Sequence, residues 1–207
     1  MLFITADKNN TSFPELFRAC IVPRPIGWIT TQNLSGKINL APYSYFNAVA
    51  DSPPMIIFST TSKHCDGRIK DTIDNVDQTR EFVINAATYA LRHQLNITAI
   101  NCKREVDETK LANLNLIPSK LIHPPRIAGS PFHLECVLHE IIQLPQGGEN
   151  AVNKLVIGKA LCIHIDEGIL TDGRVDIEKF HPIARLGYMD YTIVKDKFEM
   201  KKPFIQY

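Results

Sequence analysis

Hydrophobic and polar residues alternate along residues 132–139, as in an antiparallel strand with one buried and one solvated face. The buried face would carry Phe132, Leu134, Cys136 and Leu138, and the solvated face His133, Glu135, Val137 and His139. Residues 154–165 form a second long strand candidate, in which Gly158 predicts a bulge or a close approach of the backbone to a neighbour. Residues 145–150 would connect the two strands as a hairpin.

Shorter apolar runs predict four more strand segments. Residues 26–31 and 38–41 flank a turn at 33–36 and are expected to pair antiparallel. Pro42 is expected to interrupt the second of these strands, because proline cannot donate a hydrogen bond to a ladder, and residues 43–49 would continue as a bent segment. Two further β-rich runs predict buried strands, at 54–60 and 81–85.

Helical spacing is confined to the middle of the chain. Ile69, Ile73 and Val76 lie on one face of a predicted helix, and a four-residue spacing of apolar positions predicts another over 88–100. A short helix is predicted over 107–114. Strands outnumber helices and come in antiparallel pairs, so the fold class is mainly β, a β-barrel with inserted helices. No repeat or linker divides the chain, which predicts a single domain over residues 1–207.

Composition narrows the function classes. The 207 residues include 23 Lys and Arg and 22 Asp and Glu, for a net charge of +1. This balance argues against nucleic-acid binding, which needs a broad basic field, but leaves room for a small anionic ligand. No apolar run approaches the roughly 20 residues of a membrane span, and the first residues do not resemble a secretory signal. The expected location is therefore cytoplasmic.

Familiar catalytic and metal motifs are missing from the sequence. The five cysteines form no C-x-x-C pair, and reduced thiols are expected. His133 and His139 would lie about 20 Å apart on a strand, so they cannot share an ion, and no metal site is expected. The chain contains no G-x-S-x-G elbow, no P-loop and no G-x-G-x-x-G fingerprint.

Two polar clusters are candidate binding segments. Residues 59–63 (STTSK) follow a predicted buried strand, and Arg68, Lys70, Asp71 and Thr72 lie where a helix begins. Hydroxyls, backbone amides and a helix N-terminus together can bind a phosphate; the alternative is a solvated loop with a Ser/Thr cap. Residues 39–47 (NLAPYSYFN) combine aromatic rings with polar tips, which suit a planar ligand. The alternative there is core packing of a proline-bent strand.

The ordered motifs resemble one known family. They are PRPIGWITT at 23–31, NLAPYSYFN at 39–47, PP at 53–54, FS at 58–59, KDT at 70–72, EFVIN at 81–85, LEC at 134–136, VIG at 156–158 and RLG at 185–187. Together they are similar to the flavin reductase-like family, whose fold is the FMN-binding split β-barrel of flavoredoxin-like proteins. The resemblance covers about residues 20–190, and its most specific part is 23–47.

The resemblance implies a homodimer that binds FMN near the subunit interface. Ser59, Thr61, Lys70 and Thr72 of this chain, with Asp71 between the last two, would hold the phosphate. The ribityl chain and the ring system would contact Thr30, Thr31, Pro42, Tyr43, Ser44, Tyr45, Asn47, Asn85 and Arg185. Tyr188 stands where many relatives have glycine, which places a large ring close to the expected flavin. The resemblance assigns no general acid or base, because the flavin supplies the redox chemistry.

Three functions remain open. The first is an NAD(P)H-dependent FMN oxidoreductase, with NADH or NADPH as the electron donor and a small molecule or a protein as the acceptor. The second is an FMN-carrying electron-transfer protein that does not itself turn over NAD(P)H. The third is a non-catalytic binding protein whose barrel has lost the cofactor.

Overall fold

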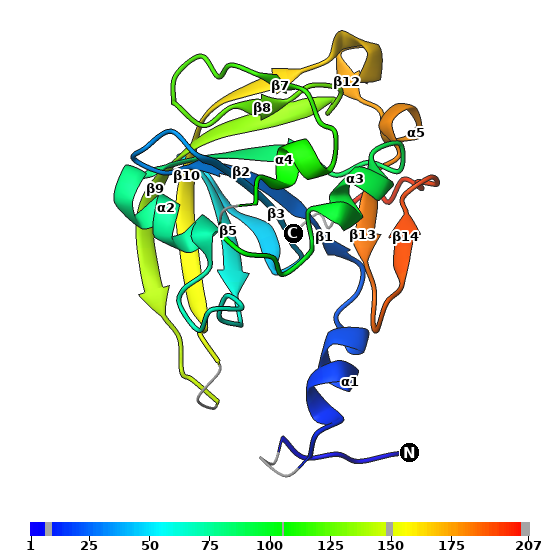
Figure 1. Ribbon diagram of the computed structural model, residues 1–207. Coiled ribbons are helices and arrows are strands. Elements are labelled where there is room, and N and C mark those ends of the chain that lie inside the picture. Colours follow the sequence, from blue (N-terminus) through cyan, green and yellow to red (C-terminus); the bar gives the residue numbers. More distant parts are fainter. Residues whose placement is uncertain (7–9, 105, 148–150, 204–207) are drawn as a thin grey trace.

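The computed structural model describes residues 1–6, 10–104, 106–147 and 151–203. Its centre is a sheet of seven strands, which are β2 (Gly27–Gln32), β3 (Ile38–Tyr43), β4 (Phe46–Asp51), β5 (Pro54–Thr60), β6 (Glu81–Ala86), β9 (Phe132–Gln143) and β10 (Lys154–Ile165). They lie in the order β3-β2-β6-β9-β10-β5-β4, and every neighbouring pair is antiparallel. Figure 1 shows the strong twist and curl of this sheet.

The two edge strands of the sheet follow one another in the sequence. Only Ser44 and Tyr45 separate the end of β3 from the start of β4. The sheet must therefore curl until its edges approach each other, and the Ser59 amide donates to the Tyr45 carbonyl at 2.8 Å beside this junction. We call residues 42–47 the seam. The result is a barrel-like sheet, as the strand pattern predicted.

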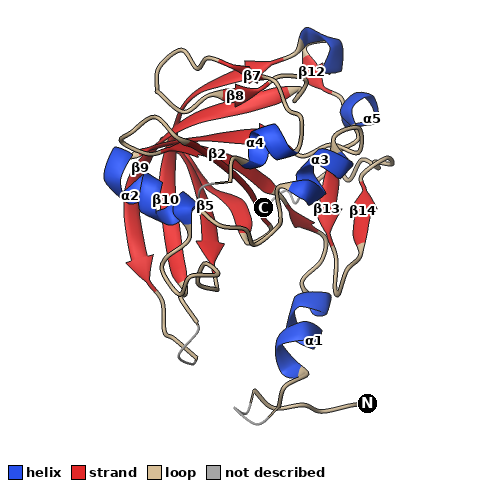
Figure 2. Ribbon diagram, viewed as in Figure 1, coloured by secondary structure: helices blue, strands red, loops and turns tan. Residues whose placement is uncertain are grey.

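Smaller elements surround the sheet (Figure 2). The short strands are β1 (Arg24–Pro25), β7 (Leu116–Ile117), β8 (Arg126–Ile127), β11 (Leu170–Thr171), β12 (Arg174–Val175), β13 (Ile183–Arg185) and β14 (Tyr191–Ile193). The helices are α1 (Phe13–Cys20), α2 (Asp71–Thr79), α3 (Arg92–Ile97), α4 (Glu108–Leu111) and α5 (Ile177–Phe180), with a 3-10 turn at Glu167–Ile169. Helix α1 projects from the body of the molecule, and none of its residues is buried.

Two hydrophobic clusters form the core. One includes Ile29, Phe58 and Phe82 and is covered by Ile73 and Val76 of α2, which confirms the predicted helix face. The other includes Trp28, Leu40 and Ile127. Trp28 and Ile29 are successive residues of β2, so they point to opposite faces of the sheet and one strand contributes to both clusters.

Gly158 behaves as predicted. The register between β9 and β10 shifts between Ile157 and Gly158, which marks a bulge. A Cβ atom on Gly158 would lie 2.3 Å from the Phe82 ring. The ring of a core phenylalanine therefore occupies the space that any other side chain would need.

Other expectations were wrong in detail. Pro42 does not interrupt β3 but pairs with Trp28 inside it; because β3 is an edge strand, the missing proline amide costs no ladder bond. The helices predicted over 88–100 and 107–114 shrink to α3 and α4. Of the predicted connection 145–150, residues 148–150 lie outside the described residues.

The polar face predicted for β9 is exposed at His139 but covered at the start of the strand. His133 and Glu135 are buried, because the segment carrying Lys120 and Leu121 packs over this face, and both of its amides donate to the Glu135 carboxylate at 2.8 and 2.7 Å. The alternation of β9 was therefore predicted correctly, but the assignment of this face to solvent holds only for His139 and is wrong for His133 and Glu135. None of the helices in the described ranges is long and apolar enough to cross a membrane.

Candidate functional site

Three neighbouring cavities follow the seam. The lysine pocket, of about 90 Å³, lies at the start of α2 and is lined by Tyr43, Lys70, Asp71, Thr72 and Glu108, among others. The arginine pocket, of about 290 Å³, is lined by Arg18, Arg24, Arg185, Tyr188 and Tyr191, among others. The helix pocket, of about 540 Å³, lies between α1 and the strands β4 and β5. The lysine and arginine pockets share Pro42 as a wall, and the arginine and helix pockets share Ser44.

Lys70 marks the anion-attracting end of the lysine pocket. It is extended and directly precedes α2, and its carbonyl accepts from the amides of Ile73 and Asp74 at 3.0 and 3.1 Å. The first amides of a helix have no partner within the helix, so they can bind an anion. Burial lowers the pKa of Lys70. Among the described residues Lys70 makes no ion pair, so its charge is desolvated without a counter-charge.

Tyr43 places a second polar group in the same pocket. Its hydroxyl is buried and has no hydrogen-bond partner among the described residues, although the Thr72 hydroxyl lies nearby. Burial raises the pKa of Tyr43 to about 12, the Thr72 hydroxyl opposes this shift, and the Glu108 carboxylate adds to it. The phenol therefore stays protonated at neutral pH and is available as a donor.

Thr72 and Thr31 belong to a chain of buried polar side chains. The Asn39 amide donates to the Thr72 hydroxyl at 2.8 Å, and the Asn75 amide donates to the Thr31 hydroxyl at 3.0 Å. Thr72 still forms part of the lysine pocket wall, whereas Thr31 is fully buried. Thr31 lines none of the three cavities, and its hydroxyl joins β2 to α2. Its contact with a ligand stays a prediction.

Thr30 and Asn85 also lie away from the three cavities. The Asn85 amide donates to the Thr30 hydroxyl at 2.8 Å and to the Trp28 carbonyl at 2.9 Å, and its oxygen accepts from the Ile127 amide at 2.9 Å. Both side chains are fully buried. Every polar atom of the Asn85 side chain is thus occupied in joining strands. The contacts of Thr30 and Asn85 with a ligand stay predictions.

Asp71 faces an arginine that the sequence did not suggest. Arg104 forms an ion pair with Asp71, donates to Asp66 at 2.9 Å and donates to the Ile69 carbonyl at 2.6 Å. Asp71 therefore holds the loop before α2 and is neutralised by Arg104, while it also lines the lysine pocket. No motif in the sequence marks Arg104, because its three partners come from the 66–71 loop and meet it only in the fold.

Glu108 is the second acidic group of the lysine pocket. It is buried, and it accepts from the Leu40 amide at 3.4 Å. Burial raises its pKa, which weakens its repulsion of an anion in the pocket. Sequence reasoning missed Glu108, and its only signal was the position after Asp107, whose carboxylate accepts from the first amides of α4.

The helix pocket contains five of the predicted residues. They are Ser44, Tyr45, Asn47, Ser59 and Thr61. Opposite them lie Phe17 of α1 and Ile21, which directly follows the last residue of α1. The four predicted phosphate residues are thus divided between two cavities, with Ser59 and Thr61 in the helix pocket and Lys70 and Thr72 in the lysine pocket. The structure without a ligand therefore does not bring these four side chains into one cavity.

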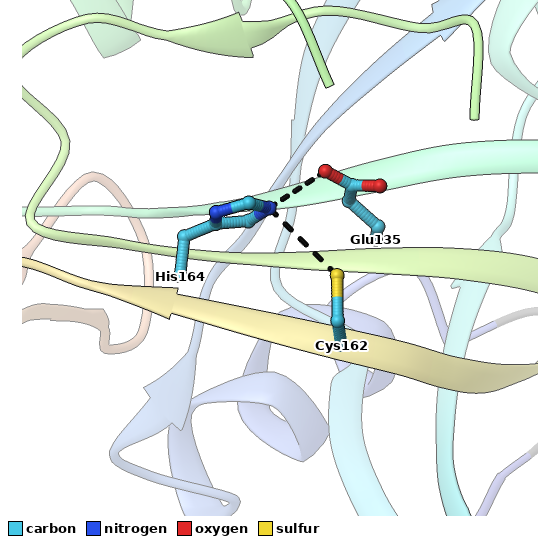
Figure 3. Close-up of side chains that lie close together, drawn as sticks. All are labelled: Glu135, Cys162 and His164. Atoms are coloured by element: carbon cyan, nitrogen blue, oxygen red, sulfur yellow. Dashed lines mark hydrogen bonds and ion pairs between the residues drawn. The ribbon is translucent and has the colours of Figure 1, made fainter. Parts of the chain in front are cut away.

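A further polar cluster lies on β9 and β10, away from the seam (Figure 3). Ligand-type atoms of Glu135, Cys162 and His164 lie within 4.8 Å of one another. His164 Nε2 lies 2.6 Å from the Glu135 carboxylate and 3.7 Å from the Cys162 sulfur. Both contacts use the same nitrogen, so the three residues are not arranged as a nucleophile–base–acid relay. Burial raises the pKa of the Cys162 thiol, which disfavours a thiolate there.

The bulge of β10 explains this cluster. The register shifts between Ala160 and Cys162, so Cys162 lies opposite Glu135 and His164 lies opposite His133. Burial raises the pKa of Glu135, but the amides of Lys120 and Leu121 together with His164 outweigh that effect and lower it. The carboxylate therefore stays charged while it anchors the covering segment. The sequence predicted a solvated His133, whereas the structure buries it.

Comparisons with known proteins agree with this architecture. Residues 18–184 match the profile of the flavin reductase like domain. An uncharacterized protein of Aquifex aeolicus is 34% identical over 193 residues, which cover 93% of this chain and 95% of the relative.

Solved structures are similar over almost the whole chain. Nitrilotriacetate monooxygenase component B from Bacillus cereus has a TM-score of 0.89 at 33% identity, covering 97% of this chain and 98% of the other. Pseudomonas fluorescens 2-nitrobenzoate 2-nitroreductase NbaA has a TM-score of 0.85 at 26% identity, covering 98% and 96%. A putative flavin reductase with a split barrel domain from Shewanella frigidimarina, 20% identical with a TM-score of 0.81 over 99% and 100%, shares the fold. The chain belongs to the flavin reductase like family and has its split-barrel fold.

Proposed function

We propose that this chain binds FMN and acts as an NAD(P)H-dependent flavin oxidoreductase. Bound flavin supplies the redox chemistry, since it accepts a hydride and releases electrons singly or in pairs. The residues of this chain need only bind the cofactor, orient it and control access to it. Membership in a family of flavin-related oxidoreductases supports the general assignment.

The observation that carries the proposal is the environment of Lys70. A desolvated ammonium group, the first amides of α2 and the unpartnered Tyr43 hydroxyl face one small cavity. Its volume of about 90 Å³ is well below the roughly 300–1,000 Å³ of cavities that enclose whole ligands. A single compact group such as the phosphate of FMN fits these features. Lys70, Thr72 and Tyr43 would hold it.

The helix pocket has the character required for the rest of the cofactor. Its volume of about 540 Å³ lies within the usual range for ligand sites. Apolar walls from Phe46, Ile57 and Leu155 suit a flat ring system, and Ser44 and Asn47 offer polar groups at its edge. The helix pocket adjoins the arginine pocket at Ser44, and the arginine pocket adjoins the lysine pocket at Pro42. An FMN molecule that occupies the lysine and helix pockets would therefore run along the seam, past the Pro42–Ser44 edge of the arginine pocket.

A second copy of the chain fits the exposed helix α1. Phe13 and Phe17 stack with centroids 6.3 Å apart, yet Phe17 is 46% exposed and no residue of α1 is buried. An apolar face of this kind favours burial against a partner. We therefore include in the proposal a homodimer in which the partner covers the helix pocket, with the protein working in the cytoplasm, where its five free thiols remain reduced.

The test compares FMN with riboflavin, which lacks the phosphate. Purified protein is expected to be yellow and to bind FMN more tightly than riboflavin. Lys70→Met should weaken FMN binding by about tenfold, the effect of losing one charge-assisted hydrogen bond, and leave riboflavin binding unchanged. Lys159→Met, at an exposed lysine of β10, is the matched control. Equal FMN affinity in the Lys70 variant would exclude Lys70 from the phosphate site.

Reduction by NADH or NADPH distinguishes an oxidoreductase from a protein that only carries electrons. Anaerobic mixing of the FMN-loaded protein with NADH and with NADPH is expected to bleach the flavin with at least one of them. Persistence of the yellow colour with both donors would favour a carrier that receives its electrons from another protein. A preparation that stays colourless and gains no stability from added FMN would favour a barrel that has lost its cofactor.

A further inference from the structure

The arginine pocket gathers positive charge without acidic partners. Arg18 comes from α1, Arg24 from β1 and Arg185 from β13, three segments that are distant in the sequence. In the described part of the chain none of the three makes an ion pair. The lining of the pocket includes no Asp or Glu. Three adjacent cations repel one another, so an anion that binds between them is stabilised by all three.

Arg24 is the fixed member of this group. It is only 6% exposed, and its guanidinium donates to the carbonyls of Arg18 and Ile21 and, at 2.8 Å, to that of Leu186. Its Nε is buried and has no partner. Burial lowers the pKa of Arg24, and the charges of Arg185 and Arg18 lower it further although Tyr45 opposes them. The other two arginines are therefore close enough to act on Arg24 electrostatically.

Arg18 and Arg185 are the adaptable members. Both are only partly exposed. The Arg185 guanidinium lies 4.5 Å from the centroid of the Tyr191 ring and donates to the Tyr188 carbonyl. The Arg18 side chain donates no hydrogen bond to any described residue. Planar guanidinium groups recognise carboxylates through paired hydrogen bonds.

Aromatic and apolar groups form the rest of the pocket. Tyr188 is 57% exposed and Tyr191 is 40% exposed, so both rings are accessible to a ligand. Ile26 and Pro42 provide apolar surface. The volume of about 290 Å³ is enough for a single substituted ring but small for a dinucleotide.

We propose that the arginine pocket binds an aryl carboxylate, with the carboxylate between Arg18 and Arg185 and the ring against the tyrosines. The pocket shares Pro42 and Ser44 with the cavities to which FMN is assigned, so such a ligand would lie beside the flavin. The assignment of aryl carboxylates as the substrate class rests on the proposed function. The binding of an aryl carboxylate in this pocket does not depend on that function.

The experiment uses benzoate as the probe and benzamide as an uncharged compound of the same shape. Calorimetric titration of the FMN-loaded protein is expected to show benzoate binding at least about tenfold more tightly than benzamide. Arg18→Met and Arg185→Met should each weaken benzoate binding by about tenfold and leave benzamide binding unchanged. Arg174→Met, at an exposed arginine of β12, is the control and should match the wild type. Melting curves confirm that each variant is folded.

Three results would overturn the inference. One is equal benzoate affinity in the wild type and in both pocket variants. Another is competition between benzoate and FMN, because the arginines would then belong to the flavin site. The third is a loss of NADPH affinity in Arg18→Met without measurable benzoate binding, which would assign the pocket to the phosphate of a donor. Titration of protein without FMN keeps the test separate from the proposed function, because failure to bind FMN leaves the benzoate measurement intact.

Discussion

Tyr43 shows how a single residue can serve both the core and a binding site. Its ring packs against Phe58 with centroids 5.2 Å apart. Its hydroxyl faces the lysine pocket, buried and without a hydrogen-bond partner among the described residues. A buried, unsatisfied hydroxyl lowers stability by roughly 1–3 kcal/mol, and under the proposed function the phosphate of FMN would accept its hydrogen bond.

Tyr43→Phe tests this explanation. Removal of the hydroxyl should leave the free energy of unfolding of the cofactor-free protein unchanged or raise it by about 1 kcal/mol, because an unsatisfied polar group is lost. FMN binding should weaken by about three- to tenfold. Urea unfolding and fluorescence titration measure the two effects. A clear loss of stability without loss of FMN affinity would make the hydroxyl part of the core alone.

Among the strands, β10 contains a position, Gly158, at which the packing leaves no room for a side chain. Strand β9 lies between β10 and β6, and the Phe82 ring of β6 extends past it to fill the place of a side chain at Gly158, where the register of β10 shifts. Phe82 is fully buried in the core cluster with Phe58. The position therefore requires glycine for lack of space, since its backbone dihedrals are not those of the left-handed region.

Gly158→Ala is expected to lower the free energy of unfolding by about 1–3 kcal/mol through overpacking against Phe82. Gly147→Ala is the matched control, since a Cβ atom there meets nothing within 4 Å. Chemical denaturation of the two variants measures the difference. Equal stability would mean that the Phe82 ring moves aside at little cost.

At the scale of the whole molecule, α1 is the helix that projects from the body and has no buried residue. The carbonyls of Arg18 and Ile21, at its C-terminal end, are held by Arg24, yet its apolar side is exposed. The C-terminal end of the helix is thus fixed by hydrogen bonds, its apolar face is exposed, and Phe17 forms part of the wall of the helix pocket. Completion of this pocket by a second copy would make cofactor binding and assembly interdependent.

Phe17→Ser should shift the protein toward monomer, weakening the dimer by at least about tenfold through the loss of one large apolar contact. FMN affinity should fall as the dimer dissociates. Leu34→Ser, at a leucine that is 77% exposed in the turn between β2 and β3, is the control. Light scattering across a concentration series measures the assembly. A wild-type protein that is monomeric at every concentration would refute this arrangement.

Local patterns in the sequence predicted the elements well, because periodicity and turn residues act over a few positions. The long strands, the helix carrying Ile73 and Val76, and the bulge at Gly158 were all identified correctly. The lengths of α3 and α4 and the exposure of His133 and Glu135 were not, since these depend on what packs over them.

The sequence by itself determined the mainly β class, the family resemblance and the segments that line the seam. Only the tertiary structure divided Ser59 and Thr61 from Lys70 and Thr72, buried Thr30, Thr31 and Asn85 in hydrogen-bonded networks, and gathered the arginines of the arginine pocket. The physical reason is that these outcomes depend on desolvation and on contacts between residues far apart in the chain. Neither residue type nor local spacing contains that information.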